Sequence, residues 1–525
     1  MGRKAALHNL GCKVNAYETE AMRQLLEKEG YEIVPFAPGA DVYVINTCTV
    51  TNIADRKSRQ MLHRARKMNP DAIIVAAGCY VETAEQPVEL DPAIDIVLGN
   101  NRKGELLEAL RRFEEQRAAH EEEQKERGSH DAGSGTAQGS SANSGVSDGG
   151  QDASERTYII EETPPQKLQN TVPPESRGGM EEILSQNTVS PESRGILEET
   201  HPRNPQENQA LIDRIDINHT KEYESLFITQ SEERTRACIK VQDGCNQFCS
   251  YCIIPFARGR VRSREIDDVL REARTLAANG CQEVVLTGIH LSSYGVDCDL
   301  TLLDLIRAVH EIPGIRRIRL GSLEPGIITE EFARSIAQLP KFCPHFHLSL
   351  QSGCTETLRR MNRRYTAEEF AAKCELLRQV FDRPAITTDV IAGFPGETEE
   401  EFETTVAFLT QLRLYETHIF KYSRRHGTRA AVMPDQIPES VKAERSDRLI
   451  ALGECNRSLF EQQYLGDTVD VLFEERITVD GRDYYTGYTK QYIRVAVPAD
   501  ADYENQILTG TLGEAFAPHL YLLQR

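Results

Sequence analysis

The sequence has no long apolar run. No stretch of its 525 residues approaches the roughly 20 consecutive apolar residues that a bilayer-spanning helix needs. The N-terminal stretch, MGRKAALHNLGCKVN, also lacks the uninterrupted apolar core of a secretory signal peptide. These absences predict a soluble, cytoplasmic protein with no membrane partner.

The cysteines lack the pattern of a disulfide framework. There are 13 of them, an odd number, spread through a chain much longer than the small secreted domains that disulfides stabilise. Metal-binding or catalytic thiols are therefore the better interpretation. A chain of this length also predicts about three domains, each able to bury its own core.

The acidic charge is concentrated in one segment. The formal net charge of −20 by itself argues against a nucleic-acid partner, but 25 acidic and 10 basic residues between Glu114 and Glu233 contribute −15 of it. The segment has no cysteine and few aromatic residues, so it cannot bury enough apolar surface to offset the entropy lost on ordering the backbone. We predict an acidic, largely disordered linker over residues 113–233. Its short duplication, QNTVPPESRG and QNTVSPESRG, is too little for a repeat architecture.

Residues 1–112 repeat the pattern of strand, loop and helix three times. The runs KAALHNL, DVYVIN and AIIVAAG are each followed by a cysteine: Cys12, Cys48 and Cys79. In an open parallel α/β sheet the loops at the carboxyl ends of the strands converge, so the three thiols are expected to meet. Three thiolates suit an iron-sulfur cluster with one open iron, although zinc or three ordinary buried cysteines are the alternatives.

A second cysteine motif follows the linker. Cys245, Cys249 and Cys252 form C-x3-C-x2-C directly after the predicted strand RACIKV. Three ligands leave one iron of a [4Fe-4S] cluster free, and no fourth cysteine or histidine lies nearby to complete a zinc site. The remaining cysteines share no spacing and are interpreted as structural.

Residues 234–460 alternate strand and helix about six times. The predicted strands are RACIKV, EVVLTG, IRRIRLGS, HFHLSLQ, AITTDVIAG and YETHIFKYS. This order predicts parallel βαβ units and a partial (β/α)6 barrel whose functional residues lie at the carboxyl ends of its strands. The candidates there are Gly288, Ser322, Glu324, Gln351, Gly393, Pro395, Gly396 and Glu397.

These motifs resemble those of a known family. The cysteine motif followed by FARGRVRSRE, LTGIHLSSYG, GSLEP, HLSLQSGC, MNRRYT and TDVIAGFPGE is similar to the radical S-adenosylmethionine (SAM) core of the methylthiotransferases. GCKVN, NTCTVTNIADRKSRQ and AAGCY resemble the first domain of that family and are closest to its MtaB-type members. The likeness covers about residues 4–112 and 235–525, and it omits the linker, which is longer than the family usually has.

The resemblance implies cofactors and a reaction. Cys245, Cys249 and Cys252 would hold the [4Fe-4S] cluster that binds SAM, and Cys12, Cys48 and Cys79 an auxiliary [4Fe-4S] cluster that supplies sulfur. One SAM would methylate that sulfur, and a second would be cleaved to a radical that activates carbon 2 of adenine. The expected SAM contacts are Gly288, Glu324, Gln351 and the segment that contains Gly393, Pro395, Gly396 and Glu397. An electron donor such as flavodoxin or ferredoxin and a sulfur donor would be needed.

Residues 461–525 change to short strands with alternating apolar residues, which predict a small five-stranded β-barrel. It resembles the TRAM domain, an RNA-binding module. Aromatic and cationic side chains alternate in this segment as in base-stacking surfaces, unless the tyrosines merely line the core: Tyr484, Tyr485, Tyr488, Lys490, Tyr492 and Arg494. The basic runs RKSRQMLHRARK, ARGRVRSR, RRMNRR and YSRRHGTR are further candidates for phosphate contacts or are simply solvated faces.

The choice of substrate depends on the N-terminal motifs. For MtaB-type members the resemblance implies N6-threonylcarbamoyladenosine at position 37, in the anticodon region of tRNA. Its carboxylate favours an arginine-lined pocket, for which Arg363, Arg364, Arg424 and Arg425 are the candidates. The alternatives are N6-isopentenyladenosine, an aspartate of a ribosomal protein, and a non-catalytic iron-sulfur or zinc protein that binds RNA.

Overall fold

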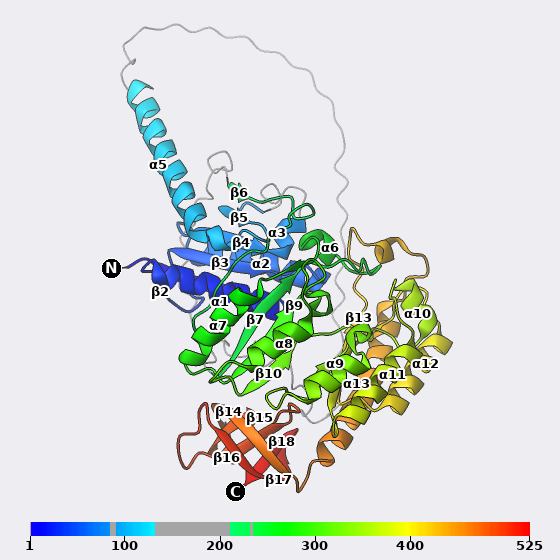
Figure 1. Ribbon diagram of the computed structural model, residues 1–525. Helices are drawn as coiled ribbons and strands as arrows, with labels where there is room; N and C mark the ends of the chain where they lie inside the picture. Colours follow the sequence, from blue (N-terminus) through cyan, green and yellow to red (C-terminus); the bar gives the residue numbers. More distant parts are fainter. Residues whose placement is uncertain (1, 84–90, 132–209, 232–234) are drawn as a thin grey trace, which may run out of the picture. The chain divides into compact units, whose positions relative to one another are not determined.

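The computed structural model describes residues 2–83, 91–131, 210–231 and 235–525 (Figure 1). Their secondary structure falls into an N-terminal parallel sheet, a central set of α/β units and a closed C-terminal barrel. The predicted α/β fold class with a terminal β-barrel is confirmed. Within the described residues, no helix combines the length and the apolar character needed to cross a bilayer.

The N-terminal sheet is parallel throughout. Its strands in sheet order are β2 (Glu32–Ile33), β1 (Lys4–Asn9), β3 (Val42–Thr47), β4 (Ile73–Gly78), β5 (Ile96–Leu98) and β6 (Leu211–Asp213). All residues of β3 and β4 are buried, as expected for central parallel strands covered on both faces. Helices α1 (Lys13–Lys28) and α5 (Leu106–Asp131) cover one face, and α2 (Asn52–Met68) covers the other.

The predicted linker is too broad at both of its ends. Helix α5 runs on to Asp131, and β6, which lies inside the predicted linker near its other end, pairs with β5 as the last strand of the N-terminal sheet. Leu226 and Ile228 are buried in the core of the central units. The prediction relied on the average composition of residues 113–233, in which the short apolar runs at β6 and around Leu226 and Ile228 are not apparent. The rest of the predicted linker, residues 132–209, lies outside the described residues.

The central region contains the six predicted parallel strands. They are β7 (Arg236–Asp243), β9 (Glu283–Gly288), β10 (Arg317–Leu320), β11 (His345–His347), β12 (Ala385–Ala392) and β13 (Glu416–Lys421). Strands β7, β9 and β10 pair in one sheet, β11, β12 and β13 in a second, and isolated bridges at Phe342 and Leu348 join the two. Helices α7 (Ile266–Ala278), α8 (Leu302–His310), α9 (Glu330–Ala337), α11 (Ala367–Val380) and α12 (Glu399–Leu412) bury their apolar sides against them.

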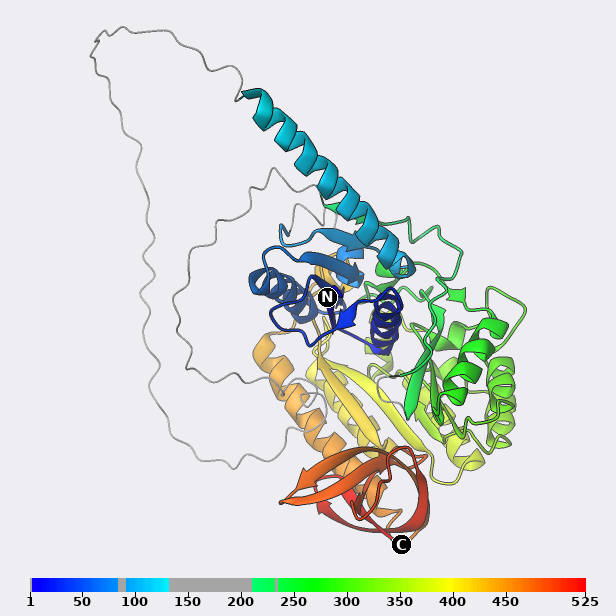
Figure 2. The same cartoon turned by 90° about the vertical axis from the view of Figure 1, so that its left-hand side faces the viewer.

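The C-terminal strands close into a barrel after the long helix α13 (Glu439–Gln462), which lies along β13 (Figure 2). The order around the barrel is β14 (Thr468–Val479), β15 (Arg482–Tyr488), β16 (Arg494–Pro498), β18 (Leu520–Gln524) and β17 (Ile507–Ala517). Arg317 and Arg319, at the start of β10, donate hydrogen bonds to barrel carbonyls at Tyr488 and Lys490. The barrel therefore contacts the amino ends of the central strands, opposite the predicted site.

Candidate functional site

The first cysteine trio lies at the carboxyl edge of the N-terminal sheet. Cys12 precedes α1, Cys48 directly follows β3, and Cys79 begins the short helix α3 (Cys79–Thr83) directly after β4. Strands β1, β3 and β4 are neighbours, so the three loops converge as predicted. Cys48 and Cys79 are buried, whereas Cys12 is exposed.

Close backbone approach holds this trio together. Gly11 has φ +125°, and a Cβ there would lie 3.2 Å from Sγ of Cys48. Gly78 has φ +93°, and a Cβ there would lie 2.5 Å from Oδ1 of Asn46. Only glycine satisfies both requirements at these positions without strain.

Hydrogen-bond donors surround Cys79. Nε of Arg258 lies 3.3 Å and Nδ2 of Asn100 lies 3.6 Å from its Sγ. Such donors stabilise a thiolate and tune the cluster that it binds. Burial, with the nearby thiols of Cys79 and Cys12 adding to it, raises the pKa of Cys48 to about 12. A bound metal would overcome this by deprotonating the thiol.

The spacing of both trios fits a cluster better than one ion. Three sulfurs on a single tetrahedral zinc would lie about 3.8 Å apart, given Zn–S bonds of about 2.3 Å. Among the described residues, neither trio brings its three sulfurs within 4.8 Å of one another. This spacing does not match three thiolates on a single zinc and leaves room for a multi-iron group.

The second trio lies in the loop after β7. The N–H of Cys245 donates to the Gly259 carbonyl (3.0 Å), and the N–H of Ser250 donates to the Met361 carbonyl (3.0 Å). Burial raises the pKa of Cys245 to about 11 and that of Cys252 to about 12. The loop is thus fixed on two sides while its thiols lie in a low-dielectric pocket.

Arg363 was predicted to bind a substrate carboxylate but lies against this loop. Its Nη1 is 3.2 Å from Sγ of Cys249, and its Nη2 is 3.7 Å from Oε1 of Glu324. The guanidinium would therefore act on the cluster and on Glu324.

Glu324 has the clearest feature of a ligand contact. Its Oε2 accepts hydrogen bonds from Gln247 (2.9 Å) and from Nε2 of His290 (3.0 Å), while the buried Oε1 has no hydrogen-bond partner in the described part of the chain. Burial acts to raise the pKa of Glu324, but the His290 hydrogen bond and the charge of Arg363 outweigh it and lower the pKa. An ionised carboxylate whose Oε1 accepts no hydrogen bond in the described residues suits the amino group of SAM, although Oε1 also forms an ion pair with Arg363 at 3.7 Å. The sequence analysis missed Gln247 and His290, although both lie inside motifs that it quoted.

Gly288 and Gln351, two further predicted SAM contacts, differ in backbone conformation and in exposure. A Cβ at Gly288 would lie 2.8 Å from Oε1 of Gln242, so the chain needs glycine there. Gln351 has φ +74°, an uncommon conformation for a residue other than glycine, and bridges to β12. Its side chain is partly exposed.

The side chain of Glu397 is engaged inside the protein. Its Oε2 accepts from the N–H of Gly393 (2.8 Å) and from Nη1 of Arg445 (2.8 Å), and the residue is 3% exposed. This carboxylate closes the turn, so the expected cofactor contact through its side chain is not supported. Pro395 is buried and Gly396 is partly exposed, which leaves the backbone of the turn as the part that can approach a ligand.

Comparison with known proteins agrees with these two centres. The family described as "Radical SAM superfamily" matches residues 239–409, and "Uncharacterized protein family UPF0004" matches residues 4–99. The chain is 34% identical to the "Threonylcarbamoyladenosine tRNA methylthiotransferase MtaB" of Bacillus subtilis, over 98% of this chain and 94% of the relative. The chain belongs to the MtaB-type methylthiotransferases. The corresponding relative in Aquifex aeolicus is 33% identical over 90% of this chain and 93% of its own length.

A relative with another printed name is also similar. The "tRNA-2-methylthio-N(6)-dimethylallyladenosine synthase" of Alkaliphilus oremlandii is 30% identical over 90% of this chain and 82% of its own length. Both groups of relatives are named as acting on tRNA. As a member of the MtaB-type family, the chain is an enzyme whose cofactors are SAM and two [4Fe-4S] clusters.

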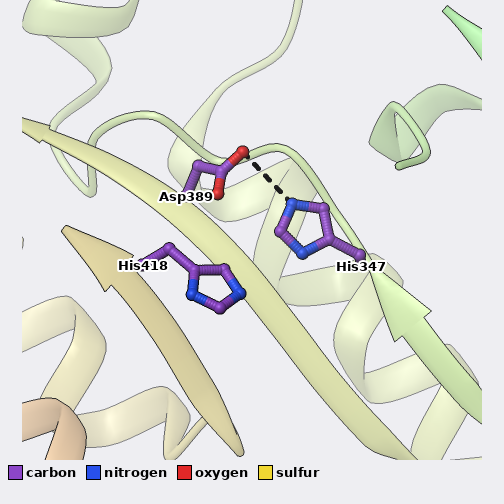
Figure 3. Close-up of side chains that lie close together, drawn as sticks. All are labelled: His347, Asp389 and His418. Atoms are coloured by element: carbon purple, nitrogen blue, oxygen red, sulfur yellow. Dashed lines mark ion pairs between the residues drawn. The ribbon is translucent and has the colours of Figure 1, made fainter. Parts of the chain in front are cut away.

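The MtaB-type chain has a polar cluster inside the central units that the sequence analysis did not single out. His347, Asp389 and His418 come from β11, β12 and β13 and face one another (Figure 3). Nε2 of His347 lies 3.2 Å from Oδ2 of Asp389, its Nδ1 lies 2.9 Å from Oγ1 of Thr387, and the two imidazole rings stack at 5.6 Å. The signal was present in the sequence, as histidines and an aspartate within the predicted strands HFHLSLQ, AITTDVIAG and YETHIFKYS.

This cluster can hydrogen-bond a substrate or hold a cation. One ligand atom from each residue lies within 4.8 Å of the others. Burial acts to raise the pKa of Asp389, but the contact with His347 outweighs it and lowers the pKa. Because Oδ2 of Asp389 already lies 3.2 Å from Nε2 of His347, the cluster does not require a metal.

The predicted carboxylate pocket is not assembled by the four arginines. Arg425 pairs with Asp55 of α2, Arg424 donates to the Ala431 carbonyl, and Arg364 is exposed. Arg363 contacts the cysteine loop, so each of the four guanidinium groups lies in a different environment, and together they do not form one pocket.

Several residues predicted to contact RNA serve the protein itself. Within the run ARGRVRSR, Arg258, Arg262 and Arg264 are buried. In the barrel, the stacked rings of Tyr488 and Tyr492 lie under the guanidinium of Arg236. These two tyrosines belong to the contact between the barrel and the central units, while Tyr484, Tyr485 and Arg494 remain candidates.

Proposed function

We propose that this chain adds a methylthio group to carbon 2 of N6-threonylcarbamoyladenosine at position 37 of tRNA, in the cytoplasm. The observation that carries the proposal is the 34% identity to the Bacillus subtilis relative over 98% of this chain. The two convergent cysteine trios support it, because the reaction requires two separate centres.

The two trios would hold the two clusters. Cys245, Cys249 and Cys252 would hold the SAM-binding cluster, and Cys12, Cys48 and Cys79 the auxiliary one. When bound, these groups supply the radical and sulfur chemistry that an unactivated aromatic C–H requires. The ring carries no acidic proton at carbon 2, so no general base of this chain could perform the reaction alone.

The remaining residues bind, orient and exclude water. Glu324 would accept a hydrogen bond from the amino group of SAM through Oε1, which accepts none within the described residues, with Gly288, Gln351 and the backbone of Gly393 and Gly396 beside it. The His347–Asp389–His418 cluster would orient the substrate base from inside the strands. An electron donor such as flavodoxin or ferredoxin and a sulfur donor complete the requirements.

The test uses reconstituted enzyme and tRNA that carries one modification at a time. Nucleoside mass spectrometry is expected to show a methylthio product from threonylcarbamoyl-adenosine and little from isopentenyl-adenosine. The opposite preference would overturn the proposed substrate while leaving the family assignment intact. tRNA from cells with and without the gene provides the matching comparison in vivo.

A further inference from the structure

Two exposed phenylalanines lie beside the second cysteine trio. Phe248 directly precedes Cys249 and is 36% exposed, and Phe256, in the short helix α6 (Ile254–Ala257) that follows the trio, is 47% exposed. Their rings meet edge to face, with centroids 5.9 Å apart and an interplanar angle of 78°. The guanidinium carbon of Arg260 lies 4.6 Å from the Phe248 centroid. This is an aromatic and cationic surface that the core does not use.

The backbone holds Phe248 in an unfavourable conformation. Its φ of +51° lies in the left-handed region, which disfavours a bulky residue and is kept only where the surroundings impose it. Nδ2 of Asn362 donates to the Phe248 carbonyl at 2.9 Å and holds the turn. Because a large part of the ring stays exposed, apolar burial does not explain the strain. The ring is therefore available for a contact made outside this chain.

The surroundings favour an anionic partner. The loop is joined to the basic run RRMNRR through Asn362 and through the hydrogen bond from Ser250 to Met361. Arg364, at the end of that run, is exposed. A phenylalanine face with a neighbouring guanidinium and further arginines matches the surfaces on which single-stranded RNA bases stack.

We propose that Phe248, Phe256 and Arg260 form a stacking platform for an unpaired RNA base next to the target adenosine. The inference rests on the proposed function, because an adenosine whose carbon 2 is to react must leave the base stack. When the target adenosine leaves the stack, the adjacent base in the RNA loses one of its two stacking partners. The platform lies beside the loop of the SAM-binding trio, where it replaces that partner and fixes the register of the RNA.

The experiment measures binding of an unmodified anticodon stem-loop RNA to the reconstituted full-length enzyme. Phe256→Ala is expected to weaken binding about five- to a hundredfold, the range that loss of one base–aromatic stack produces. Phe256→Trp is expected to restore it. Ile450→Ala, on α13, removes a side chain of similar exposure (46%) and is the matched control, with no expected change.

A second readout reports the stacking itself. With 2-aminopurine beside the target position, wild-type enzyme is expected to change the fluorescence on binding, and Phe248→Ala and Phe256→Ala to abolish that change. Because Phe248 adjoins a cluster ligand, its variant is used only with iron content equal to that of the wild type. If the Phe248 variant loses iron, the comparison of Phe256→Ala with Phe256→Trp still tests the proposal.

Two outcomes would overturn the platform. Unchanged RNA affinity in Phe256→Ala with full iron content is one. The other is slower reduction of the enzyme by flavodoxin with unchanged RNA affinity, which would assign the surface to the electron donor. Since the RNA is unmodified, a platform effect in an enzyme that fails to act on threonylcarbamoyl-adenosine would overturn the proposed substrate alone.

Discussion

The Glu18 carboxylate allows a sharp test of how the N-terminal sheet is held to the central units. Glu18 lies on α1 and is fully buried. It accepts from Arg258 (2.8 Å) and Lys240 (2.8 Å) of the central region, and its other oxygen lies 3.1 Å from Nζ of Lys103. Glu18→Gln preserves the shape of the side chain and removes its charge. We expect it to destabilise the protein strongly.

The magnitude follows from the charges left behind. After the substitution Lys240 and Arg258 keep one buried anion, Asp243, at 2.6 Å and 3.2 Å, whereas Lys103 loses its ion pair with Glu18. Removing one partner of a buried ionic group costs about 3–5 kcal/mol. For a chain of this size that is a drop in Tm of about 3 to 5 °C.

The measurement is thermal unfolding of the reconstituted enzyme together with its iron content. Arg258 also contacts Cys79, so iron is expected to fall with stability. Glu20→Gln is the control on the same helix. Glu20 pairs with Arg23 at the partly exposed surface, where such a pair is worth less than about 1 kcal/mol.

The pH dependence gives a further check. Burial acts to raise the pKa of Glu18, but Arg258, Lys103 and Lys240 outweigh it and hold the pKa well below its usual range. The stabilisation is therefore complete above the unfolded pKa of about 4.3 and is lost as pH falls through the folded pKa. The Tm gap between wild type and Glu18→Gln should stay constant from about pH 8 to about pH 5 and narrow in acid. A Tm within about 2 °C of the wild type at neutral pH, with full iron content, would refute the reasoning.

Three further predictions concern the cysteines, the acidic segment and the barrel. Alanine at Cys245, Cys249 and Cys252 should remove about half of the iron and all SAM cleavage. Alanine at Cys12, Cys48 and Cys79 should remove the other half of the iron and abolish methylthio transfer, while SAM cleavage is retained. Unchanged iron content in either triple variant would contradict the corresponding assignment. Replacing residues 132–209 by a Gly/Ser linker that spans the gap should leave turnover within a few-fold, but a deletion that also removes β6 should lower Tm. Deleting residues 465–525 should weaken tRNA binding and uncover the buried Arg317 and Arg319, and binding by the full chain should fall steeply with salt in a filter assay.

The sequence was most informative where local patterns decide the structure. The strands before Cys12, Cys48 and Cys79 are short apolar runs, and the rule for parallel sheets places their loops together. The six central strands and the closed barrel followed from the same kind of pattern. Each of these features depends on residues close together in the chain.

Long-range pairing and buried charge could not be predicted in this way. Strand β6 pairs with β5 across more than a hundred residues, so nothing local indicates it. The sequence of a basic run also does not show whether its arginines bind phosphate or form ion pairs with buried carboxylates. Arg258 binds Glu18, which lies 240 residues away in the sequence, and Arg264 binds Glu272. The inward-facing His347 and Asp389 were likewise hidden inside strands assigned by their apolar neighbours.

The position of β6 bears on how the chain folds during synthesis. The N-terminal sheet cannot gain its edge strand until the ribosome has made residue 213, well after β5 has emerged. Closing so long a segment adds only about 0.6 kcal/mol for each doubling of its length. The late addition of β6 to the sheet therefore costs little additional loop-closure free energy.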